Sequence, residues 1–209
     1  MTTFNRSLYL KECLGSFLQT LFVEPVRLVI TDDASTDEAT LKFLDEFSKI
    51  KTSNLEIVVR YRVDNLGVDR SAVEAINYCF ETYGGDWVLV QDSDVIFHYL
   101  WLVVLRSMMS LVDLPVYALS LWKFRCWSSG EFKGLDLMPG LNGMNVLVHR
   151  EIFNKIKVEV GVCWDYKLSE VCYENNYPML RTRQSFVKHI GTFGVHLFDE
   201  DTTMDFIGD

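Results

Sequence analysis

Two carboxylates flank a serine directly after a short apolar segment. Trp87 to Val90 leads through one glutamine into Asp92-Ser93-Asp94, and Val29 to Thr31 leads into a second acidic pair, Asp32-Asp33. Carboxylates held close together repel one another, and a bound cation or hydrogen bonds from a ligand relieve that repulsion. Because oxygen-only ligands select hard ions, the pattern predicts a Mg²⁺ or Mn²⁺ site that meets a phosphate-bearing ligand.

A simpler interpretation applies to any single acid at the end of a strand. Such a residue commonly caps the next helix or faces solvent. Capping accounts for Asp37, but it leaves Asp32 and Asp33 unexplained. The alternation of Asp92 and Asp94 across one residue, after an apolar strand, favours the cation site more strongly than a bare D-x-D would.

The acids depend on strands and helices that bring them together. Segments dense in Val, Ile, Leu and aromatic residues predict six buried strands: 26–31, 55–61, 87–90, 116–121, 144–149 and 185–190. Apolar residues at helical spacing predict three early helices. The first is capped by Ser7, the second opens at a capping box of Ser35 to Glu38, and the third runs from about Asp69 to Tyr83 before Gly84-Gly85.

The order of these segments predicts an α/β fold. Strand and helix alternate through the first half of the chain, which favours a mostly parallel central sheet flanked by helices. We expect one domain over 1–209, with a nucleotide-binding half at about 1–95 and an acceptor and catalytic half at about 96–209. If the strands ending at Thr31 and Val90 are parallel neighbours, their acids face one crevice at the carboxyl edge of the sheet.

Composition narrows the class of protein. A formal charge of -9 disfavours a general nucleic-acid binder, because such proteins cluster Lys and Arg. Five widely spaced cysteines without a C-x-x-C pair predict neither a disulfide framework nor a zinc site. Charged residues and a proline interrupt the most apolar region, Val95 to Trp122, so no transmembrane segment is predicted. We expect a cytoplasmic protein, with peripheral attachment to a membrane left open.

Four ordered blocks of sequence carry a resemblance to a known family. The chain resembles the family 2 glycosyltransferases of the GT-A fold through Thr2–Leu10, Val29–Asp37, Asn65–Gly67 and Gln91–Asp94. The resemblance implies a metal-dependent, inverting transfer of a sugar from a nucleotide-diphosphate donor, with UDP-sugars favoured. The acceptor is then a hydroxyl of a glycan or another molecule, as in polysaccharide biosynthesis.

The resemblance also implies where the donor lies. It places Thr3, Phe4 and Arg6 beside the base, and Asp33 as acceptor for a uracil N–H or a ribose hydroxyl. The block from Asn65 to Arg70 then lies near the base and diphosphate, although Arg70 is equally well explained as a surface residue of the following helix.

The D-x-D triplet would hold the cation and part of the donor. By the resemblance, Asp94 binds the metal, Asp92 touches ribose or a metal-bound water, and Ser93 lies beside the nucleotide sugar. His189 resembles a late family position that supplies a further metal or diphosphate contact. A lone histidine is also commonly a structural, hydrogen-bonded residue.

The far end of the pocket needs a base for the acceptor hydroxyl. Asp165 resembles the family's catalytic base, and its position before a predicted helix also fits an N-cap. Asn142-Gly143 resembles a loop that leaves room for the sugar and acceptor, and Trp164 is a candidate to stack on a sugar ring.

Three departures and two rival functions qualify the resemblance. The family's first strand normally precedes the block that begins here at Thr2, Ala34 stands where glycine is common, and Trp164 stands where an acid often precedes the base. A sugar nucleotidyltransferase would carry a Gly-rich, basic phosphate loop, which Thr2 to Lys11 lacks. A glycan- or nucleotide-binding module without turnover is the other alternative.

Overall fold

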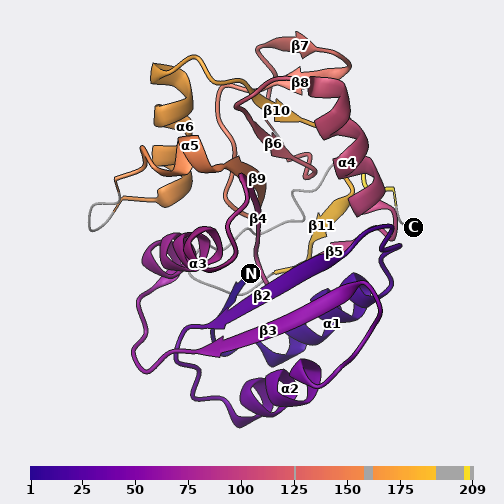
Figure 1. Cartoon of the computed structure of the whole chain (residues 1–209), viewed down its shortest axis with the longest axis vertical. Coiled ribbons are helices and arrows are strands. Elements are labelled where there is room, and N and C mark those ends of the chain that lie inside the picture. The colour runs from indigo at the N-terminus through magenta and orange to yellow at the C-terminus, as the bar shows by residue number, and fades with distance from the viewer. Residues whose placement is uncertain (125, 158–161, 192–204, 208–209) are drawn as a thin grey trace.

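A three-stranded parallel sheet carries the first acidic pair (Figure 1). The computed structural model describes residues 1–124, 126–157, 162–191 and 205–207. Strand β2 (Val26–Asp32) lies between β1 (Thr2–Thr3) and β3 (Leu55–Tyr61), and both partners run parallel to it. The β2 sequence alternates little and is buried from Leu28 to Asp32, as expected for a strand covered on both faces.

Three amphipathic helices connect and cover these strands. They are α1 (Ser7–Leu18), α2 (Glu38–Ser48) and α3 (Val68–Tyr83). Asp37 is the N-cap of α2 and accepts hydrogen bonds from the amides of Ala39 and Thr40, so the predicted capping role of Ser35 is wrong. Ser7 is likewise the first helical residue of α1, and not its cap.

A mixed sheet of six strands forms the second half of the fold (Figure 1). Its first strand, β4, is antiparallel to β9, which is antiparallel to β6, whereas β10 runs parallel to β6. In spatial order the strands are β4 (Trp87–Gln91), β9 (Asn145–His149), β6 (Ala118–Ser120), β10 (Met179–Arg181), β8 (Leu135–Leu137) and β7 (Gly130–Phe132).

A short pair of antiparallel strands brings His189 close to the acidic triplet. Strand β5 (Val95–Phe97) pairs with β11 (Val187–His189), and His189 lies opposite Val95. The remaining helices are α4 (Trp101–Val112), α5 (Arg150–Phe153) and α6 (Trp164–Glu174). No helix in the described part of the chain is both long and apolar enough to cross a membrane.

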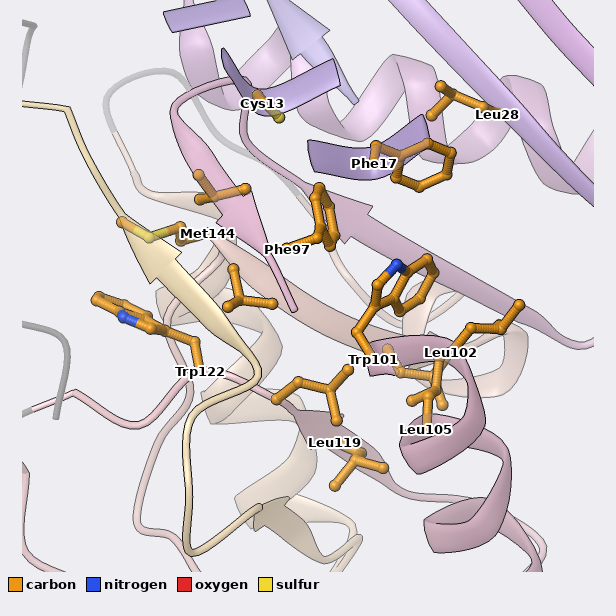
Figure 2. Close-up of a cluster of buried hydrophobic side chains, with 14 of the residues drawn as sticks. Cys13, Phe17, Leu28, Phe97, Trp101, Leu102, Leu105, Leu119, Trp122 and Met144 are labelled. Atoms are coloured by element: carbon orange, nitrogen blue, oxygen red, sulfur yellow. The ribbon is translucent and has the colours of Figure 1, made fainter. Parts of the chain in front are cut away.

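The largest hydrophobic cluster connects the two sheets. Figure 2 shows Phe17 of α1, Phe97 of β5 and Trp101 of α4 close together within it. The Phe17 and Phe97 rings meet edge to face at 5.2 Å between centroids, and Trp101 donates a hydrogen bond from Nε1 to Thr20 Oγ1 at 2.7 Å. This packing fixes β5, and therefore the acidic triplet before it, against α1.

The predicted α/β class is confirmed, and all six predicted strands are present with small shifts at their ends. One expectation about their arrangement is wrong. Strands β2 and β4 belong to different sheets, so they are not hydrogen-bonded neighbours. Asp33, Asp92 and Asp94 nevertheless line one pocket, and helix α3 contacts both β1 and β4.

A buried amide beneath the acidic triplet gives a test of this architecture. Asn145 is fully buried, donates to Gln91 Oε1 at 2.6 Å and accepts from the amide of Leu121 at 2.9 Å. Asn145→Ala leaves both partners unpaired, and we expect it to lower the free energy of unfolding by about 2–3 kcal/mol. Urea unfolding measures the change. Asn175→Ala, on the partly exposed end of α6, serves as control, and equal losses in the two variants would contradict the assignment.

Candidate functional site

A cavity of about 350 Å³ opens where β1 and β4 end. Every site residue predicted from the sequence lines this cavity except Arg70, which is an exposed residue of α3. The predicted residues that line the cavity are Thr3, Phe4, Arg6, Asp33, Asn65, Asp92, Ser93, Asp94, Asn142, Gly143, Trp164, Asp165 and His189. Residues from the beginning, middle and end of the chain therefore meet in one place.

Asp94 is a buried carboxylate beside a guanidinium and an imidazole. It is 5% exposed, and its Oδ2 contacts the Arg6 guanidinium and lies 3.6 Å from His189 Nε2. Burial alone would raise the pKa of Asp94, but the hydrogen bond from His189 and the charge of Arg6 together lower it. The resemblance places Arg6 beside the base of the donor, and in the structure its guanidinium contacts Asp94.

The chemistry around Asp94 fits a divalent cation. Its other oxygen, Oδ1, is buried and has no hydrogen-bond partner among the described residues. No group of three or more His, Cys, Asp or Glu side chains over the described ranges is arranged to enclose a metal. Mg²⁺ and Mn²⁺ sites commonly use one or two carboxylates and complete their shell with phosphates and water. Asp94, with His189 beside it, therefore suits a cation that is shared with a ligand.

Asp92 is in a different electrostatic environment. Burial, followed by repulsion from Asp94, raises its pKa to about 8. The amide of Asp92 donates to the carbonyl of Met144 at 2.9 Å, which fixes the turn after β4. The two acids of the triplet therefore have opposite shifts of pKa, and Asp94 is the one that stays ionised at neutral pH.

The first acidic pair secures the loop before α3. Asp33 Oδ2 accepts hydrogen bonds from the amides of Leu66 and Gly67 at 3.2 and 3.0 Å, and Asn65 Nδ2 donates to the Asp33 carbonyl at 2.9 Å. Two pocket-facing groups beside it are available to a ligand. Among the residues that the structure describes, Thr3 Oγ1 is buried without a hydrogen-bond partner, and Phe4 is 43% exposed.

Asp165 lies in the first turn of α6, facing the pocket. Its Oδ2 accepts from the amide of Gly143 at 3.0 Å, and its Oδ1 accepts from the amide of Tyr166 at 2.8 Å. The alternative that Asp165 is the N-cap is wrong, because Cys163 occupies that position. A carboxylate held by two amides keeps further lone pairs for another donor.

Two glycines permit close contacts around these acids. A Cβ on Gly143 would lie 2.7 Å from the Trp164 ring, and a Cβ on Gly191 would collide with the Asp94 carboxylate and the His189 ring. Trp164 is 4% exposed and packs in the second hydrophobic cluster, so little of its ring is open for stacking on a sugar.

Asp69 and Ser71 are among the pocket-lining residues that the sequence did not single out. Asp69 Oδ1 accepts a hydrogen bond from the Trp164 amide at 3.0 Å, so a residue of α3 caps the start of α6. Ser71 is 1% exposed, and its Oγ has no partner in the described part of the chain. Asp69 falls four residues after Asn65, but a cap supplied from another helix leaves no local sequence signal.

The sequence of residues 1–164 matches the family described as glycosyl transferase family 2. No curated protein sequence matches the chain. Similar solved structures include residues 1–349 of S. aureus TarS, with a TM-score of 0.65 and 19% identity over 89% of this chain and 58% of that one.

Two further structures share the fold. A mannosyltransferase from Pyrobaculum calidifontis, solved with GDP-Man and Mn²⁺, has a TM-score of 0.62 and 16% identity over 86% of this chain and 52% of that one. GalNAc-T7, solved with UDP, GalNAc and Mn²⁺, has a TM-score of 0.61 and 14% identity over 86% and 40%. The chain thus spans roughly half the length of these proteins.

The raised pKa of Asp92 predicts a pH-dependent stability. Between the ordinary value of 3.8 and about 8, the folded protein holds a proton that the unfolded chain has lost. This group therefore makes the free energy of unfolding fall as pH rises through that window. We expect Asp92→Asn to reduce the loss of stability between pH 5 and 8 by roughly 1–2 kcal/mol in EDTA. Urea titrations measure it, with exposed Asp86→Asn as control; an unchanged pH profile would contradict the assignment.

Gly143 gives a steric test of the contact that holds Asp165. Gly143→Ala forces the added methyl into the Trp164 ring, and we expect it to cost about 1–3 kcal/mol of stability. Gly15→Ala is the matched control, because a Cβ at this exposed position in α1 meets nothing within 4 Å. That variant should gain about 0.5–1 kcal/mol. Thermal unfolding of both variants tests the pair, and a neutral Gly143→Ala would exclude the close contact.

Proposed function

The chain belongs to glycosyl transferase family 2, and from that premise we propose that it transfers a sugar from a nucleotide-diphosphate donor to an acceptor hydroxyl, with inversion at the anomeric carbon. One observation carries the proposal. The buried, partly unpaired carboxylate of Asp94 and the amide-held carboxylate of Asp165 face the same cavity of about 350 Å³. Asp94 can hold a cation at the leaving group, while Asp165 can receive the proton of the acceptor hydroxyl.

The nucleoside is assigned to the end of the cavity formed by β1 and the loop before α3. Phe4 offers an exposed ring to a base, and Thr3 Oγ1 can exchange a hydrogen bond with it. Asp33 has lone pairs beyond those used by the loop amides, so it can accept from a uracil N–H or a ribose hydroxyl. A UDP-sugar is the favoured donor.

The diphosphate is assigned to the neighbourhood of Asp94. Asp94 and His189 would hold a Mn²⁺ or Mg²⁺ ion, which when bound neutralises charge that develops on the departing nucleotide. Arg6 lies against the same carboxylate and can place its guanidinium on a phosphate oxygen once it leaves Asp94. Asp92, with its raised pKa, can donate a hydrogen bond to ribose or to water.

The acceptor is assigned to the Asp165 side of the pocket. Asp165 would take the hydroxyl proton as the oxygen attacks the anomeric carbon and the bond to the nucleotide diphosphate breaks. Direct attack from the face opposite the leaving group inverts the configuration. The amides of Gly143 and Tyr166 orient the carboxylate for this step.

Replacing Asp94 tests the cation site. We expect Asp94→Ala to weaken Mn²⁺ binding at least tenfold and to abolish Mn²⁺-dependent binding of UDP, because the remaining His189 cannot hold the ion alone. Isothermal titration calorimetry measures both affinities. Asp86→Asn, at the other end of β4, should bind as the wild type does. Undiminished binding and turnover of donor after removal of the metal would overturn the scheme.

Replacing Asp165 separates chemistry from binding. Asp165→Asn keeps the shape of the side chain but removes the proton acceptor, and we expect kcat to fall by about 10²–10⁴ while donor affinity changes little. Glu170→Gln, on the exposed face of the same helix, is the control. Donor hydrolysis with and without Mn²⁺ distinguishes an enzyme from a binding module, since a module would bind UDP-sugars without consuming them.

A further inference from the structure

A buried arginine is paired with Asp33 outside the wall of the pocket. Arg62 follows the last residue of β3, and its side chain is 10% exposed. Its Nη1 lies 3.6 Å from Asp33 Oδ1. Asp33 lines the pocket, whereas Arg62 is not among the described residues that do so. The guanidinium therefore acts on a molecule in the pocket through Asp33.

Helix α3 holds Arg62 in place. Arg62 Nη2 contacts Glu74 Oε2 and donates to the carbonyl of Ser71 at 3.4 Å. Arg60, two residues earlier and therefore on the same side of the strand, donates to Glu74 Oε1 at 2.9 Å. The hydrogen bond from Arg60 lowers the pKa of Glu74, so this glutamate is a charged partner at neutral pH. Arg62 is thus fixed between a carboxylate of α3 and the carboxylate of Asp33.

Part of the Arg62 guanidinium is buried without hydrogen bonds. Its Nε and Nη1 have no hydrogen-bond acceptor among the residues that the structure describes. Donors of a buried charged group are costly to leave unpaired, and the carboxylate that Nη1 faces is that of Asp33. Hydrogen bonds in enzyme sites are often long without substrate and tighten in the complex. A small movement of the Asp33 carboxylate converts this ion pair into a hydrogen bond.

The neighbours of Asp33 determine which hydrogen bonds it can offer to a ligand. The amides of Leu66 and Gly67 donate to its carboxylate, and Arg62 places a positive charge beside it. All three neighbours suit an acceptor, so Asp33 presents acceptor oxygens to the pocket. Uracil carries a ring N–H on its pairing edge, whereas cytosine carries a bare ring nitrogen there. An acceptor binds the first edge and is repelled by the lone pair of the second.

We propose that Arg62 is a positioning residue that makes the nucleotide site selective for bases with a ring N–H, by holding the Asp33 carboxylate as an acceptor toward the pocket. The inference rests on the proposed function, which assigns the nucleoside to Asp33. Without Arg62 the buried carboxylate loses its cationic partner, and such groups turn toward water or become neutral. Either change removes the acceptor, and with it the preference for uracil over cytosine.

The test compares the binding of UDP and CDP, which differ in the pairing edge of the base. Isothermal titration calorimetry with Mn²⁺ gives both dissociation constants, and GDP against ADP repeats the comparison for purines. We expect the wild type to prefer UDP by about tenfold or more, because a site built around one hydrogen bond rejects an analogue that lacks it. Arg62→Met should reduce this preference to less than about threefold. Arg62→Lys keeps the charge on a smaller head group and should give an intermediate preference.

Arg60→Met is the matched control. The Arg60 guanidinium contacts Glu74 and lies 3.6 Å from the centroid of the Tyr78 ring. Its loss weakens the link between β3 and α3 but leaves the ion pair of Arg62 with Asp33. We expect Arg60→Met to lower the midpoint of thermal unfolding and to keep the UDP preference of the wild type. If Arg62 only fastened α3 to β3, the two methionine variants would change that preference equally.

A double-mutant cycle shows whether Arg62 acts through Asp33. In an Asp33→Asn background, the added Arg62→Met change should leave the ratio of UDP to CDP affinity unaltered. If Arg62→Met does not fold, Arg62→Lys carries the comparison, and a wild-type ratio in that variant overturns the proposal.

Three other results also overturn the proposal: a wild-type ratio in Arg62→Met, an equal loss in Arg60→Met, or equal affinity of the wild type for UDP and CDP, which would assign Asp33 to the ribose. A preference that depends on Arg62, found without sugar transfer, supports this proposal and overturns the proposed function alone. A wild type that binds none of the four nucleotides overturns both.

Discussion

The burial of Asp92 and Asp94 side by side is the constraint on which the rest of the structure depends. Two carboxylates so placed cannot both stay ionised without compensation. The pair is stabilised unequally: burial and repulsion raise the pKa of Asp92, whereas the Asp94 carboxylate is compensated by the charge of Arg6, 88 residues away, and by a hydrogen bond from His189. Electrostatic compensation thus joins the start of α1, the turn after β4 and strand β11.

Backbone geometry then determines how closely these segments approach. The Asp94 carbonyl accepts from the amide of Ile190 at 2.9 Å, and the absent side chain of Gly191 leaves room for the Asp94 carboxylate. On the opposite side of the pocket, the absent side chain of Gly143 leaves room for the Trp164 ring, and the Gly143 amide donates to Asp165. The distance between the two acidic regions is therefore fixed by main-chain contacts on both sides. Such contacts vary less than those of long side chains.

Local patterns predicted much of this fold, and tertiary pairing explains what they missed. Apolar density located strands such as β2, because burial on both faces leaves a signal in the sequence. The division of the strands into separate sheets left no such signal, since strand partners are chosen by long-range register. The contact between Arg6 and Asp94 joins residues 88 positions apart, so no local pattern indicates it. Ala34 occupies a left-handed position, with φ of 64°, which explains why glycine is common there.

The hydrogen bonds between Asp33 and the loop before α3 affect how the pocket binds a ligand. Leu66 and Gly67 donate to its carboxylate, and Asn65 bridges the same segment to the Asp33 carbonyl and to the amide of Gly67. The conformational entropy of this loop is therefore lost during folding and not during association. A molecule that enters the pocket meets a preorganised surface, so its contacts there contribute to affinity without an ordering cost.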